Sequence, residues 1–245
     1  MHNKTMLSLS ILLTLNVSGF INAQQPGDQV WFFPTGSAMV ASPAIDTQGN
    51  IIAGSEDFVS YSLTPNQQLN WAFETTDMVT GNAAVSPRGY TVFGSWDGSV
   101  YAVNPDGSQR WSFNAGAFIS ASPAINVSGK VYIGSRDGLF YSLNPDGTLD
   151  WVYVANDAIR GGAAIGPDGT VYFGDESGTF YALTPNGELK WQFETDKITD
   201  RNSRIRTIPA IDRNHHIYFG SGNHFFYALY PNGEVKWKFE TGDKN

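Results

Sequence analysis

The chain of 245 residues contains no cysteine. This absence excludes disulfide bonds, thiolate nucleophiles, covalently attached c-type haem and metal sites with cysteine ligands. It also excludes a lipid anchor carried on an N-terminal cysteine. Any stability must therefore come from packing and hydrogen bonding, and any site must be built from other residue types.

Positive charge is also scarce. Lysine and arginine number 15 against 23 aspartate and glutamate residues, which gives a formal net charge of -8. Proteins that bind nucleic acid neutralise phosphates with lysine and arginine. The charge balance therefore argues against a nucleic-acid partner.

Only the start of the chain carries an apolar run of any length. Residues 1–23 have a short basic start, an apolar core around Met6–Leu15 and a small residue at Ala23. This pattern predicts a secretory signal peptide, cleaved to leave a domain at 24–245 that begins with Gln24. The run is too short to span a bilayer comfortably, so an uncleaved membrane anchor is the weaker alternative. We expect a secreted or periplasmic protein that is not transmembrane after cleavage.

What the chain has in abundance is repetition. Its tryptophans recur at spacings of 40, 40, 40, 40 and 46 residues, and tyrosine, proline and glycine keep the same step. Such a period is the mark of a repeat architecture. The repeating tryptophans are Trp31, Trp71, Trp111, Trp151, Trp191 and Trp237.

Each repeat contains four strand-like pieces. In the third repeat these are residues 121–125, 130–135, 139–144 and 150–154, with glycine-containing turns between them. Proline sets φ at the first turn position of Pro-Asp-Gly, and glycine supplies the positive φ that closes it. Four strands in about forty residues predict one blade of a β-propeller.

The repeat resembles the pyrroloquinoline-quinone-type (PQQ-like) propeller repeat from Trp31 to Gly242. Ala102, Gly107 and Trp111 are similar to the tryptophan-docking motif of that family. The resemblance implies that the recurring tryptophans are structural blade-docking residues. Within the family, the chain most resembles the non-catalytic branch of outer-membrane assembly lipoproteins.

The number of blades leaves two alternatives. Five complete blades are predicted, and one extra N-terminal outer strand at 30–36 precedes them. Either five blades close into a ring, which is slightly favoured, or the chain is an arc of a larger propeller. The five predicted blades are 37–76, 77–116, 117–156, 157–198 and 199–242.

No familiar catalytic motif is present: the sequence lacks G-x-S-x-G, H-E-x-x-H and a P-loop. We therefore expect no enzymatic activity and no cofactor. His215 and His216 are adjacent, and adjacent residues on a strand point to opposite faces, so no metal site is predicted.

Three functional classes remain open. The favoured one is an exported scaffold that binds a protein partner in the cell envelope or extracellular space. A glycan-binding propeller is the second. A PQQ-dependent dehydrogenase is the third, and it is disfavoured because family enzymes commonly have a vicinal disulfide and more blades.

The predicted working surface is the propeller face that carries the inter-blade loops, which link one blade to the next. The loop into the fifth blade is six residues longer than the others, and arginines gather in the last two loops, while acids recur in turns of the first three blades. One interpretation gives these features no binding role: the long loop is a solvated insertion, and the aspartates only form turns. The sharper hypothesis is a docking site for an acidic segment. Its candidate residues are Arg160, Arg201, Arg204, Arg206, Asp57, Asp97 and Asp137.

Overall fold

The computed structural model describes residues 31–197 and 202–242. The chain divides into two units, Met1–Pro34 and Thr35–Asn245, and all assigned strands belong to the second. The predicted signal peptide and Arg201 lie outside the described residues. Over those residues, no helix has the length and hydrophobicity needed to cross a membrane.

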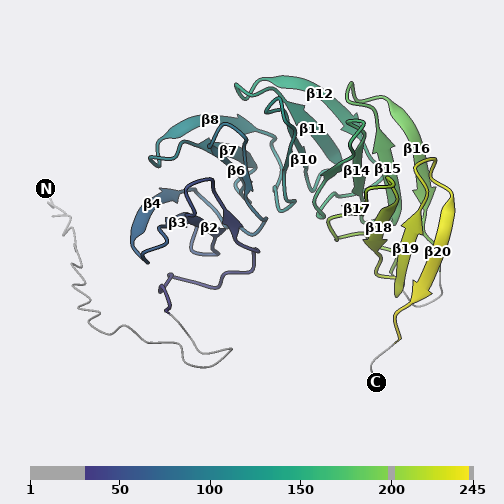
Figure 1. The fold of residues 1–245 in the computed structure, drawn as a ribbon, viewed down its shortest axis with the longest axis horizontal. Helices are drawn as coiled ribbons and strands as arrows, with labels where there is room; N and C mark the ends of the chain where they lie inside the picture. Colours follow the sequence, from purple (N-terminus) through teal and green to yellow (C-terminus); the bar gives the residue numbers. More distant parts are fainter. Residues whose placement is uncertain (1–30, 198–201, 243–245) are drawn as a thin grey trace, which may run out of the picture. The chain divides into compact units, whose positions relative to one another are not determined.

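Five antiparallel sheets of four strands each make up the described part of Thr35–Asn245, one sheet per repeat (Figure 1). This confirms the predicted all-β fold of propeller blades. The additional N-terminal segment predicted at 30–36 precedes the sheets, and its described residues, 31–36, are assigned to none of them.

Each blade runs in chain order from its first to its fourth strand. The first blade holds β1 (Ala44–Ile45), β2 (Ile51–Gly54), β3 (Val59–Leu63) and β4 (Leu69–Glu74). The second holds β5 (Ala84–Val85), β6 (Thr91–Gly94), β7 (Ser99–Val103) and β8 (Gln109–Asn114). The third holds β9 (Ala124–Ile125), β10 (Val131–Gly134), β11 (Leu139–Leu143) and β12 (Leu149–Val154). The fourth holds β13 (Ala164–Ile165), β14 (Val171–Gly174), β15 (Thr179–Leu183) and β16 (Leu189–Glu194). The fifth holds β17 (Ala210–Ile211), β18 (Ile217–Gly220), β19 (Phe225–Leu229) and β20 (Val235–Glu240).

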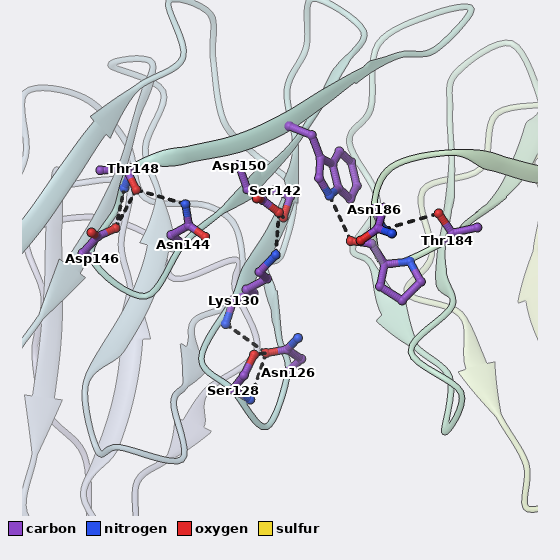
Figure 2. Close-up of polar contacts among 12 residues, drawn as sticks. Asn126, Ser128, Lys130, Ser142, Asn144, Asp146, Thr148, Asp150, Thr184 and Asn186 are labelled. Carbon is purple, nitrogen blue, oxygen red and sulfur yellow. Dashed lines mark hydrogen bonds and ion pairs between the residues drawn. The ribbon is translucent and has the colours of Figure 1, made fainter.

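The outer hairpin of each blade is fixed by its own turn chemistry. In the third blade, Gly147 has a φ of 86°, a conformation that glycine adopts without strain. Asp146 accepts hydrogen bonds from the backbone N–H of Thr148 at 3.1 Å and from its hydroxyl at 2.7 Å (Figure 2). Lys130, which directly precedes β10, pairs with Asp150 of β12 at 2.6 Å and ties the start of the second strand to the fourth. The turn residues therefore hold β11 and β12 in register.

The core lies between blades rather than within one sheet. Phe140 of the third blade stacks on Phe173 of the fourth with ring centroids 3.9 Å apart. Phe180 of the fourth stacks in the same way on Phe219 of the fifth at 4.1 Å. Each blade thus buries one face against the next, and burial of these aromatic faces is the main favourable term in joining them.

A tryptophan–glycine contact locks each pair of blades. The indole Nε1 of Trp111 donates to the carbonyl of Pro145 in the next blade at 3.1 Å, and Trp151 and Trp191 make the same bond to Pro185 and Pro231. A Cβ added at Gly147 would lie 2.6 Å from the Trp111 ring. Glycine is therefore required twice at this turn, for its positive φ and for the space that the indole occupies.

The two end blades depart from this pattern. Trp237 on β20 is 41% exposed, whereas Trp71 and Trp111 are 7% and 8% exposed. In the first blade the turn position that is glycine elsewhere is Gln67, which holds a φ of 68°. No described residue covers the outward face of the fifth blade as the next blade does inside the array. Whether five blades close into a ring or form part of a larger propeller stays a prediction.

Trp111→Ala should lower the free energy of unfolding by about 3–5 kcal/mol, because it removes a buried indole and leaves a cavity between blades. Trp237→Ala is the matched control and should cost less, since Trp237 is 41% exposed against 8% for Trp111. Equilibrium denaturation with urea measures both. Equal losses for the two variants would show that the fifth blade is covered as the inner blades are.

Candidate functional site

The inter-blade loops and the middle turns share one face of the array. The middle turn is the loop between the second and third strands of a blade. The backbone N–H of Arg136 donates to Phe118 O at 3.1 Å, and that of Glu176 donates to Ala158 O at 2.9 Å. Each middle turn is thereby tied to the inter-blade loop of its own blade, so side chains from the two loops meet.

Three arginines converge on Glu176 in the middle turn of the fourth blade. Arg206 binds its carboxylate with two parallel hydrogen bonds, from Nε at 2.6 Å and from Nη2 at 2.9 Å. The Nε of Arg204 lies 3.2 Å and the Nε of Arg160 lies 3.7 Å from Glu176 Oε2. The Glu176 side chain is only 7% exposed, while the arginine side chains are about a third to a half exposed. One buried carboxylate thus organises three cations that face solvent.

The charges shift each other's proton affinity. Burial acts to raise the pKa of Glu176, but the hydrogen bond and charge of Arg206 and the charges of Arg160 and Arg204 outweigh burial, and the pKa lies below its ordinary value. The hydrogen bond to Glu176 raises the pKa of Arg206. Burial and the charges of Arg160 and Arg206 lower the pKa of Arg136. The lowered pKa keeps Glu176 a carboxylate at neutral pH, as the single anion among the interacting side chains of Arg136, Arg160, Arg204 and Arg206.

An aromatic platform continues the cluster across the second and third blades. The rings of Trp96 and Phe118 stack with centroids 5.5 Å apart and an interplanar angle of 16°. The guanidinium of Arg136 lies 4.1 Å from the Trp96 ring centroid, a cation–π contact. Arg136 Nε also donates to Ser120 Oγ at 3.1 Å. Because Phe118 is exposed, the platform offers apolar surface beside the cations.

The predicted acidic residues lie in the middle turns of the first three blades, and their carboxylates accept hydrogen bonds from groups in or next to those turns. Asp57 accepts hydrogen bonds from the N–H of Val59 at 3.1 Å and from the Tyr61 hydroxyl at 2.8 Å. Asp97 bonds Ser99 and Tyr101 in the same way. Asp137 accepts from the N–H of Leu139 at 3.1 Å. These hydrogen bonds give the aspartates the turn-forming role that was the alternative to a binding role.

The structure brings Arg160, Arg204 and Arg206 together, as the docking hypothesis requires, whereas Asp57, Asp97 and Asp137 do not join them. The face also carries charges outside the pattern read from the sequence, because Arg136 stands in the third blade and Glu176 in the fourth. Sequence reasoning missed Glu176. The sequence signal that could have found it is the repeat itself. Glu176 occupies the middle-turn position that holds Trp96 and Arg136 in the two preceding repeats, and these residues also belong to the site.

The rest of the described chain offers no competing metal centre. In residues 31–197 and 202–242, no group of three or more histidine, aspartate and glutamate side chains is placed to hold a metal ion. His216 instead pairs with Asp212, with Nδ1 and Oδ2 2.9 Å apart.

Glu176→Gln should lower the free energy of unfolding by about 1–3 kcal/mol at neutral pH, because it removes the buried anion to which the three arginines are bound. The folded-state pKa of Glu176 is depressed, so its contribution is present above the unfolded pKa near 4.5 and is lost as pH falls through the folded value. The gap between wild type and variant should therefore shrink in denaturation curves taken at progressively lower pH. Glu188→Gln, at an exposed position, is the control and should leave stability unchanged at every pH. A pH-independent gap would contradict this role of Glu176.

Comparison with known proteins identifies the family. No curated protein matches the chain. The family model described as outer membrane protein assembly factor BamB matches residues 24–244, nearly the whole sequence. The five repeated blades and the match agree, and the chain belongs to the outer membrane protein assembly factor BamB family of PQQ-like propeller proteins.

Proposed function

We propose that the protein is a non-catalytic, exported binding scaffold whose arginine face docks an acidic segment of a protein partner in the cell envelope. The observation that carries the proposal is the charge of the cluster around Glu176. Three guanidinium groups against one carboxylate leave two positive charges, and Arg136 adds a third. This surplus stands on a chain whose formal net charge is -8.

Because guanidinium groups held this close repel one another, a further negative charge from a ligand would stabilise the cluster. The arginine side chains are about a third to a half exposed, so their outer donors remain accessible to a ligand. Arginine forks match carboxylates in a bidentate geometry that lysine does not provide. The exposed Phe118 beside them favours a polypeptide, which brings apolar side chains together with carboxylates.

The family relationship supports a protein partner. The family is described as an outer membrane protein assembly factor, and assembly involves contacts with other proteins. A signal peptide at 1–23 would export the chain to the cell envelope, where outer-membrane proteins are assembled. The alternatives, a glycan ligand and quinone-dependent chemistry, gain no support from a specific observation.

Arg160→Gln combined with Arg206→Gln should weaken capture of the partner from envelope extract by about tenfold or more, because each removes a forked donor. Quantitative pull-down at low salt measures the loss, since electrostatic contacts are strongest there. Arg88→Gln makes the same charge change at an exposed position and should capture normally. A circular-dichroism melt establishes that the variants are folded.

Arg160→Lys with Arg206→Lys separates charge from geometry. It keeps both charges and removes both forks, so capture should be intermediate. Full capture of the partner by the glutamine double variant would overturn the proposal.

A further inference from the structure

The outward face of the fifth blade contains a cavity of about 340 Å³ beside the arginine cluster. Its lining includes Arg204 and Arg206 on one side and Gly220, Ser221 and Phe226 on the other. The cavity lies at the end of β18, where each of the other blades meets its neighbour.

At the equivalent place in the first four blades, a branched aliphatic side chain of the next blade fills the space. The side chain rests directly on the last glycine of the second strand, so closely that a Cβ on that glycine would clash with it. The four pairs are Val79 on Gly54, Ile119 on Gly94, Ile159 on Gly134 and Ile205 on Gly174. A Cβ on Gly220 would instead meet only its own blade, at 3.4 Å from Thr207 Cγ2 and 4.0 Å from Phe226 Cδ2.

A backbone hydrogen bond accompanies each filled socket. The N–H of Ile159 donates to Ser135 O at 2.9 Å, and that of Ile205 donates to Asp175 O at 3.0 Å. The matching carbonyl of the fifth blade is Ser221 O. Within the described residues it accepts one backbone hydrogen bond, from His224 N–H at 3.2 Å, and Ser221 lines the cavity.

We propose that this cavity is a socket for an extended segment of the protein partner, which inserts an isoleucine or valine against Gly220 and donates its backbone N–H to Ser221 O. A carboxylate next to the inserted isoleucine or valine would pair with Arg204, which lines the cavity. The inference rests on the proposed function and names the motif by which the partner is held. The four internal interfaces are the argument for the occupant, because each shows the same socket closed by such a residue.

A second copy of this chain does not supply the motif. Its first blade would present Met39 in place of valine or isoleucine, and Ala53 where Phe93, Phe173 and Phe219 provide the aromatic layer. It would also set Gln67 against Trp237, at a turn where an added Cβ would lie only 2.5–2.7 Å from the tryptophan side chain in the internal interfaces. The first blade therefore fits the fifth poorly, and an external segment is the better occupant.

The probe is a synthetic peptide with the sequence of residues 117–126 in which Ser120 is replaced by glutamate, so that Ile119 is followed by a carboxylate. The ¹⁵N-labelled mature chain is titrated with it and followed by NMR. The backbone amides of Gly220, Ser221 and Gly222 should shift. A peptide with Ile119→Gly, the control for the inserted side chain, should bind about tenfold more weakly or not at all.

Gly220→Ala is the decisive variant of the protein. The added methyl fits the free fifth blade and should leave the melting temperature unchanged, yet it occupies the point on which the inserted side chain must rest. Peptide affinity should fall about tenfold or more. Gly174→Ala, at a filled socket, should lower the melting temperature, which shows that the same change is harmful where a neighbour is already in place.

Two results would overturn the socket: no perturbation of these amides by about 1 mM peptide, a concentration that detects even weak binding, or equal affinity of wild type and Gly220→Ala for the peptide. The proposed function fails separately. If the Arg160 and Arg206 glutamine variant loses the envelope partner while Gly220→Ala keeps it, the arginine face stands and the socket is wrong. If the arginine variant keeps the partner, the proposed function itself is wrong.

Discussion

The array depends on one contact, in which a branched aliphatic residue of one blade packs on the glycine that ends the second strand of the blade before it. It closes the small space at the end of the second strand, and it fixes where the inter-blade loop must run. Between the third and fourth blades, the N–H of Ile159 bound to Ser135 O and the ring of Trp151 on Gly187 fasten two parts of the same interface. Both contacts demand glycine, because any Cβ would occupy the space of the partner side chain.

The arginine face is a consequence of this constraint. Ile205 is held in the socket at Gly174, and its chain neighbours Arg204 and Arg206 are thereby placed over the middle turn of the fourth blade. Glu176 in that turn receives both arginines, together with Arg160 from its own blade. A charged cluster that joins two blades is thus positioned by an apolar lock beneath it, and its geometry does not depend on the flexible arginine stems alone.

The repeat made most of the fold predictable. Tryptophan, proline and glycine recur in step because each blade solves the same packing problem with the same residues, and local turn chemistry fixes each hairpin. The site was only partly predictable. Arg160 and Arg206 could be found by aligning loops. The pairing of Arg206 with Glu176, however, requires knowing that residues thirty positions apart meet across a blade boundary. Asp57 and Asp97 resembled binding acids in sequence, and only their bonds to Tyr61 and Tyr101 show what they do. The open socket at Gly220 has the same sequence signature as the filled ones, because the missing neighbour leaves no trace in the residue itself.

The absence of cysteine makes the central claim, that the arginine face meets a protein partner, directly measurable. Phe118→Cys gives a unique thiol on the exposed platform, and Val127→Cys gives a matched thiol in the turn between β9 and β10 of the same blade, where the side chain is 95% exposed. Each variant is labelled with a thiol-reactive photo-crosslinker and irradiated in envelope extract. The account predicts a specific protein adduct from position 118, lost at high salt, and none from position 127. An adduct from position 127 with none from position 118 would contradict it.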